Sequence, residues 1–154
     1  MSDDDLYIRQ QIVRDRLRRT IELVERLMAG RQDWQGRDYH RHDLEVMERL
    51  PAEATDTERK AALLHSVFDT RAATPEDLLA CGVEPAVVDV VRLVTNGPGV
   101  RGYAAYVQKC RDIVASGNRA AMRVKLADML ANEGHPTNNY AETIAIMRAG
   151  LTKR

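Results

Sequence analysis

The sequence predicts an all-α protein, folded as a single helical bundle of about seven to eight helices over residues 1–154. Apolar residues recur at steps of three and four along most of the chain, which is the period of a helix with one buried face. Capping residues, prolines and glycines divide this pattern into segments of helical length. Aromatic residues make up only 5% of the chain, and no segment alternates apolar and polar residues as a half-buried strand does.

The first predicted helix begins in the acidic run at Asp3, where carboxylates favour the positive end of the helix dipole, and ends at Gly30. Its apolar face is formed by Val13, Leu17, Ile21, Val24 and Met28. A polar loop over 31–38 leads to a second helix from Tyr39 to Leu50, which Pro51 ends. Since the first helix is long and amphipathic, we expect that it is able to pair with a second copy in a homodimer.

The later helices are marked by caps and prolines. Thr55 and Glu58 have the spacing of a capping box ahead of the apolar run 61–68, and Thr74 and Asp77 repeat it with a proline at the first helical position. The remaining helices are predicted over about 85–95, 102–116, 119–131 and 138–150.

Composition excludes several classes of function. The 23 basic residues balance the 23 acidic ones, whereas a dedicated nucleic-acid binder normally carries a basic excess. No apolar run approaches the length that crosses a bilayer, and the acidic N-terminus does not resemble a signal peptide. Cys81 and Cys110 lack the spacing of a metal or redox motif. We therefore expect a cytoplasmic protein without nucleic-acid or membrane partners.

Two polar residues interrupt apolar helical segments. His65 lies within 61–68 and Asp128 within 124–130, so each is either a hydrogen-bonded core residue or part of a site. His40 and His42 point in different directions from a helix start, so at most one of them faces the core, and His135 is expected at the surface. Two histidines and one aspartate from three helices can converge inside a bundle and bind a first-row divalent ion.

The order of these residues resembles the HD-domain metal-dependent phosphohydrolases. The resemblance is closest to the stand-alone alarmone (ppGpp) hydrolases of the RelA/SpoT type and spans about residues 20–132. It is carried by Arg31, Gly36, Tyr39 and His42, by Leu63-Leu64-His65, by Thr74 with Asp77-Leu78, and by Val124-Lys125-Leu126-Ala127-Asp128 with Asn132.

The resemblance implies a site and a reaction. It implies that His42, His65 and Asp128 hold one divalent ion, usually manganese, and that Asp69 has a catalytic role near the attacking water. The implied nucleotide-binding residues are Arg31, Tyr39 and Asn132. Lys125 and Arg101 are further candidates for substrate binding, because a polyanionic nucleotide needs positive charge at its site. The family reaction removes pyrophosphate from the 3′ position of a guanosine nucleotide.

The sequence also departs from the family pattern. Ser66 replaces the metal-binding aspartate of the His-Asp doublet, and one acid of the following Glu-Asp pair is missing at 69–70. Gln32 replaces a lysine, and the loop 96–102 lacks the expected acidic and lysine pattern. A literal His-Asp pair occurs at His42-Asp43, but its register is not that of the doublet.

Three interpretations remain open on the sequence alone. The chain is a metal-dependent nucleotide phosphohydrolase with a reduced metal site. Alternatively, it is a degenerate relative that binds a nucleotide or a partner without hydrolysis. In the third interpretation it is a structural module, in which His65 and Asp128 satisfy each other in the core.

Overall fold

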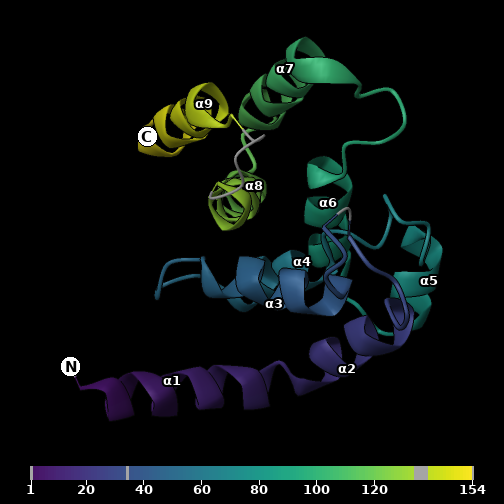
Figure 1. The fold of residues 1–154 in the computed structure, drawn as a ribbon, viewed down its shortest axis with the longest axis vertical. Coiled ribbons are helices and arrows are strands. Elements are labelled where there is room, and N and C mark those ends of the chain that lie inside the picture. Colours follow the sequence, from purple (N-terminus) through teal and green to yellow (C-terminus); the bar gives the residue numbers. More distant parts are fainter. Residues whose placement is uncertain (1, 34, 134–138, 154) are drawn as a thin grey trace.

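The all-α prediction is confirmed by a computed structural model of the chain, which describes residues 2–33, 35–133 and 139–153 (Figure 1). Nine helices and no strand lie in these residues. The helices are α1 (Asp3–Arg16), α2 (Arg18–Leu27), α3 (Tyr39–Glu48), α4 (Asp56–Leu64), α5 (Pro75–Ala80), α6 (Pro85–Val94), α7 (Gly102–Ala115), α8 (Arg119–Asn132) and α9 (Ala141–Thr152).

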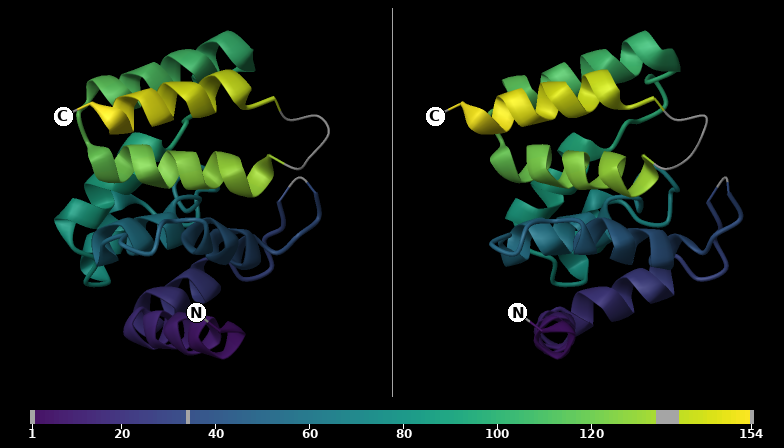
Figure 2. Two further views of the ribbon diagram at one scale, coloured as in Figure 1. Left: turned by 90° about the vertical axis from the view of Figure 1, so that its left-hand side faces the viewer. Right: turned by 60° about the vertical axis from the view of Figure 1, so that its left-hand side comes forward.

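The helices are stacked in layers around α8. Figure 2 shows α7 and α9 on one side of α8, with α3 and α4 on the other side and α1 beyond them. Helix α8 packs against α3, α4, α6, α7 and α9. It is therefore the central element of the bundle, and its polar residues are placed between neighbouring layers.

The predicted first helix is two helices, and this part of the prediction is wrong. Leu17 separates α1 from α2 with φ −97° and ψ 11°, and its side chain is fully buried in the core. The apolar period runs through this position without interruption, so the sequence gives no sign of a break. The bend turns Leu23 and Val24 of α2 into the core, whereas none of the residues of α1 is buried.

Helix α4 is shorter than the apolar run 61–68 suggests. It ends at Leu64, and His65 and Ser66 begin a turn that continues to Ala72. The backbone N–H groups of Ala72 and Ala73 both donate to the carbonyl of Val67, which closes this turn. Two polar side chains are thereby placed at the end of a buried helix, where their direction is not set by the helical period.

One of the two predicted capping boxes is complete, and the other forms only in part. Thr74 and Asp77 form a complete capping box. The Thr55 side chain caps α4 by accepting from the backbone N–H of Glu58, but the Glu58 carboxylate binds Arg123 of α8 at 3.1 Å instead of returning to the cap. Trp34, His135 and the predicted start of the last helix at 138 lie outside the described residues.

No helix among the described residues combines the length and the apolar character needed to cross a membrane.

Candidate metal centre

Three separate segments bring His42, His65 and Asp128 together. His42 comes from α3, His65 from the turn after α4, and Asp128 from α8. One ligand atom of each residue lies within 4.8 Å of the other two. Asp128 Oδ1 is 3.3 Å from His42 Nε2 and 3.5 Å from His65 Nε2. The structure therefore contains a group of residues that could hold a metal ion.

The surrounding core fixes the three side chains in place. Helix α3 turns His42 inward with Val46, one turn further along, while His40 is only partly buried and lies outside the group. The last four residues of α4, from Ala61 to Leu64, are fully buried and hold the turn at His65. Asp128 is partly exposed toward a cavity between α3 and α8.

Hydrogen bonding determines the tautomer of His65. Its Nδ1 lies 2.6 Å from the carbonyl oxygen of Ala62. That oxygen only accepts, so Nδ1 carries the proton and donates. In the neutral ring the lone pair is therefore on Nε2, which lies 3.2 Å from Ser66 Oγ and 3.5 Å from Asp128 Oδ1. A backbone carbonyl that orients an imidazole in this way is typical of metal-binding histidines.

The distances from Asp128 to the two imidazoles are compatible with a shared metal ion. Two ligand atoms about 2.1 Å from one ion lie about 3.0–3.4 Å apart in octahedral or tetrahedral arrangements. The separations between Asp128 and the two imidazole nitrogens, 3.3 and 3.5 Å, are close to this range. They are longer than the usual 2.7–2.9 Å of a charge-assisted hydrogen bond. Two neutral imidazoles with one carboxylate suit a first-row transition metal.

A further carboxylate, Asp43, lies behind this group and was not assigned to the site from the sequence. Its side chain is fully buried. Its Oδ1 accepts a hydrogen bond from Ser66 Oγ at 3.0 Å and lies 3.4 Å from His65 Nδ1, while Oδ2 has no hydrogen-bond partner among the described residues. A buried carboxylate therefore lies within hydrogen-bond distance of Ser66, on α3 and one residue after His42.

Burial and mutual interaction shift the pKa values of His65, Asp43 and Asp128. Burial alone would lower the pKa of His65, but the Asp128 carboxylate, with smaller effects from Asp43 and the Ala62 carbonyl, raises it to about 9. Burial raises the pKa of Asp43 to about 6, against the opposing influence of His65 and Ser66. Burial also acts to raise the pKa of Asp128, but the nearby histidines hold it well below its usual range. The metal-free site therefore contains a charged His65 beside an ionised Asp128.

This pairing predicts that the metal-free protein loses stability at high pH. The folded pKa of His65, about 9, lies above the unfolded value of about 6.5. Its contribution to stability is therefore complete below about pH 6.5 and is lost as the pH rises through about 9. We expect a loss on the order of 1–3 kcal/mol in the free energy of unfolding, measured by urea titration in chelator between pH 6.5 and 10. If the His65→Gln variant loses the same stability between pH 6.5 and 10, the loss does not come from His65.

A cavity of about 230 Å³ opens next to the three candidate ligands. Its lining includes Tyr39, Ser66, Asp69, Lys125 and Asn132, in addition to the candidate ligands. Five of the residues that the sequence analysis associates with the site therefore share one cavity with the metal group. The volume is below the range of about 300–1,000 Å³ for pockets that enclose a whole drug-sized ligand, so it accommodates only part of a nucleotide.

Lys125 supplies the positive charge of the cavity wall. Its side chain is buried, and its Nζ donates to Asn96 Oδ1 at 2.9 Å and to the Val94 carbonyl at 3.4 Å. It also lies 5.0 Å from the centre of the Tyr106 ring. None of the described carboxylates forms an ion pair with it, although its charge helps to lower the pKa of Asp128.

Asp69 also lines the cavity and is hydrogen-bonded to the loop after α6. Its carboxylate accepts hydrogen bonds from the backbone N–H groups of Gly97 at 3.0 Å and Asn96 at 3.4 Å. Gly97 has φ +76°, a left-handed conformation that favours glycine. This loop therefore fixes the orientation of Asp69 and also supplies the Asn96 side chain that binds Lys125.

Two of the predicted substrate residues lie away from the cavity lining. Arg31 is exposed, and its Nη1 donates to the carbonyl of Thr70 at 2.9 Å, which places it at the rim because Thr70 lines the cavity. Arg101 is exposed at the start of α7 and does not line the cavity.

No family model and no curated protein sequence matches this chain.

Proposed function

We propose that this protein is a metal-dependent phosphohydrolase of the HD type that acts on a nucleotide, with a guanosine 3′-pyrophosphate such as ppGpp as the expected substrate. His42, His65 and Asp128 are its metal ligands, and Mn²⁺ is the expected ion. The observation that carries the proposal is the convergence of these three side chains, from three separate segments, at the wall of one cavity.

The charges around the cavity also indicate where an ion would bind. Asp69 and Asp128 line it together with Lys125 and the protonated His65, while Asp33 is paired with Arg37 at 3.0 Å. A divalent ion would replace the proton of His65, because a metal-binding imidazole has to be neutral. The ion would also polarise a phosphate group of the substrate.

The residues of the chain would divide the remaining tasks. The reaction adds water to phosphorus and breaks the bond to the ribose 3′ oxygen, which leaves with a proton. Asp69 would accept the proton of the attacking water. Lys125 would bind the charged pyrophosphate, and Tyr39 and Asn132 would contact the nucleotide. Arg31 at the rim would stack on a base that extends beyond the small cavity.

A second candidate function is nucleotide binding without hydrolysis. Ser66 provides a hydroxyl where the family pattern has a metal-binding carboxylate, and Asp69 already accepts two backbone hydrogen bonds. Both features weaken a catalytic site while leaving Lys125 and Arg31 able to bind an anionic nucleotide.

One experiment separates the two functions. The protein is purified without chelator, its metal content is measured, and release of pyrophosphate from ppGpp is followed with added Mn²⁺. Hydrolysis that disappears with chelator supports the phosphohydrolase. Binding of ppGpp without release, weakened in Arg31→Ala, supports the second candidate. If the protein binds neither metal nor nucleotide, both candidate functions are contradicted, and a structural role is left for the buried cluster.

A further inference from the structure

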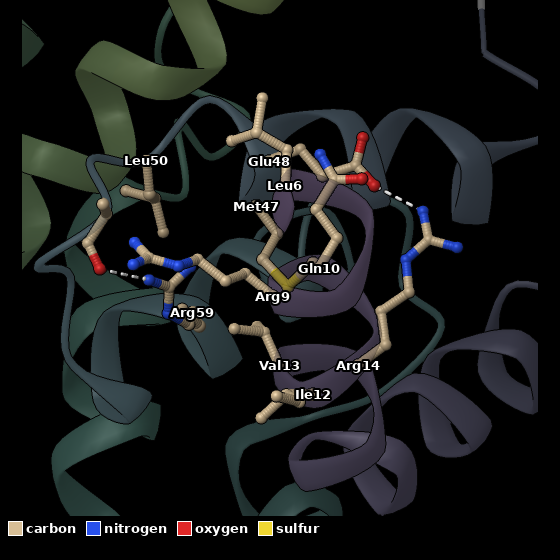
Figure 3. A pocket seen from close by; sticks show the side chains of 11 residues that line it. Leu6, Arg9, Gln10, Ile12, Val13, Arg14, Met47, Glu48, Leu50 and Arg59 are labelled. Atoms are coloured by element: carbon tan, nitrogen blue, oxygen red, sulfur yellow. Dashed lines mark hydrogen bonds and ion pairs between the residues drawn. The ribbon is translucent and has the colours of Figure 1, made fainter. Parts of the chain in front are cut away.

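A second cavity lies between α1 and the α3–α4 region and shares no lining residue with the first. Its volume is about 440 Å³, within the range of small-molecule pockets. Its apolar lining includes Leu6, Ile12 and Val13 of α1 and Met47 and Leu50 on the opposite side (Figure 3). None of its described lining residues is aromatic, so its apolar part suits an aliphatic chain and not a stacked ring.

Arg59 of α4 lies in the wall of this cavity without a counter-ion. Its side chain is about nine-tenths buried, with 8% of the residue exposed. Its Nη2 donates to the carbonyl of Ala52 at 3.0 Å, but its Nε is buried and has no hydrogen-bond partner among the described residues. No described carboxylate forms an ion pair with it. A buried guanidinium in this situation is costly unless an anion accompanies it.

Three acidic residues of α3 and α4 are each paired with another arginine. Their pairs are Glu58 with Arg123 at 3.1 Å, Asp56 with Arg16 at 3.0 Å, and Glu48 with Arg14 across the cavity. Glu53 is exposed in the loop before α4 and forms no ion pair with Arg59. Since none of these four side chains neutralises Arg59, a bound anion would supply the counter-charge.

Helix α1 adds a second cation and incomplete apolar packing. Arg9 also lines the cavity and has no ion pair with a described residue. In Figure 3 the guanidinium groups of Arg9 and Arg59 both point toward the end of the cavity near Leu50. On the same helix, Leu6 and Ile12 line the cavity yet remain about half exposed, at 47% and 58%.

We infer that this cavity binds an aliphatic carboxylate, a free fatty acid of medium chain length. The carboxylate pairs with Arg59 and Arg9, because a guanidinium fork matches the two oxygens of a carboxylate. The chain lies along Leu6, Ile12 and Met47 and completes the packing of α1 against the rest of the bundle. The site is separate from the metal centre and does not depend on the proposed hydrolase activity.

The test uses decanoate at concentrations below its micelle threshold and isothermal titration calorimetry on the full chain. We expect one decanoate per chain, and at least about tenfold weaker binding in Arg59→Met and in Arg9→Glu. Because Arg9 is exposed, Arg9→Glu tests the inference even if Arg59→Met fails to fold. Arg92→Met, at an exposed position of α6 outside the cavity, is the matched control and should bind normally.

Ligand controls separate the charged head from the chain. Acetate, which lacks the chain, and decyltrimethylammonium, which reverses the charge, should both bind at least tenfold more weakly than decanoate. Bound decanoate should also slow hydrogen exchange in α1. Equal binding of decyltrimethylammonium, or unchanged binding in both arginine variants, would overturn the inference. So would a homodimer that occupies the cavity and is dissociated by Arg9→Glu.

Discussion

Asp128→Asn is expected to weaken Mn²⁺ binding by at least about a hundredfold and to reduce nucleotide hydrolysis to the background rate. Asp128 is the only carboxylate in the group of three candidate ligands. Asparagine keeps the size of the side chain but removes its charge, so the ion would be left with two neutral imidazoles. A hard divalent ion such as Mn²⁺ prefers oxygen anions, and the loss of its only charged ligand has a larger effect than the loss of one imidazole.

The measurement is a metal titration monitored by calorimetry, together with pyrophosphate release from ppGpp. Asp89→Asn is the matched control, because Asp89 is an exposed aspartate of α6 that does not line the candidate site. Thermal unfolding in chelator shows whether the variant is folded. Some loss of stability is expected, since Asp128 lies near both imidazoles. If Asp128→Asn changes only this stability and leaves metal binding unaltered, Asp128 is a structural residue.

The fold was predictable because most of its helices begin and end with local signals. Thr74 with Asp77, and the proline at position 85, determine helix starts through backbone hydrogen bonding and dihedral preference, which depend on neighbouring residues alone. The break at Leu17 was not predictable in this way. The break arises because α2 turns toward the core while α1 remains outside. Which of the two helices is buried depends on contacts with residues distant in sequence.

The three candidate metal ligands were predictable from the sequence, but the neighbouring Asp43 was not. Burial of a histidine and an aspartate in apolar segments marked His65 and Asp128, and the family resemblance added His42. Asp43 was dismissed because its register differed from that of the His-Asp doublet. A signal was nevertheless present, since Asp43 lies three and four residues before the buried Val46 and Met47 and so shares their face of the helix.

The sequence indicates the positions of charged side chains less well than those of apolar side chains. Arg101 has the charge expected of a phosphate ligand, but it lies at an exposed helix start. Arg59 lies in a highly charged stretch that reads as a solvated helix face, yet it is buried beside an apolar cavity. The position of a long flexible side chain depends on which partners the fold leaves available, and the periodicity of the sequence does not contain that information.

Ser66→Asp is expected to strengthen Mn²⁺ binding by about tenfold or more and, at the same time, to destabilise the metal-free protein by about 2–4 kcal/mol. The family pattern alone predicts the gain in affinity, because the substitution restores a charged ligand. The structure adds the loss of stability. Ser66 Oγ lies 3.0 Å from Asp43 Oδ1, so the new carboxylate would be placed against a buried acid.

The two effects have to appear together if residue 66 faces the ion. A metal that binds the folded state stabilises it in proportion to its affinity, so Mn²⁺ should raise the melting temperature of Ser66→Asp more than that of the unaltered protein. Ser66→Asn, which has the same size without the charge, is the control for the substitution itself. It should lower stability less and should not strengthen metal binding.

A double variant distinguishes charge repulsion from general disruption. In Asp43→Asn/Ser66→Asp the neighbouring acid is removed, so the metal-free protein should recover most of the lost stability while the gain in metal affinity remains. This recovery is expected because coupling between residues in contact is usually 0.5–3 kcal/mol. If stability is not recovered, the carboxylate at position 66 destabilises the protein by disturbing its packing and not by charge repulsion. If affinity does not rise in either variant, Ser66 is not at a ligand position, and the metal depends on His42, His65 and Asp128 alone.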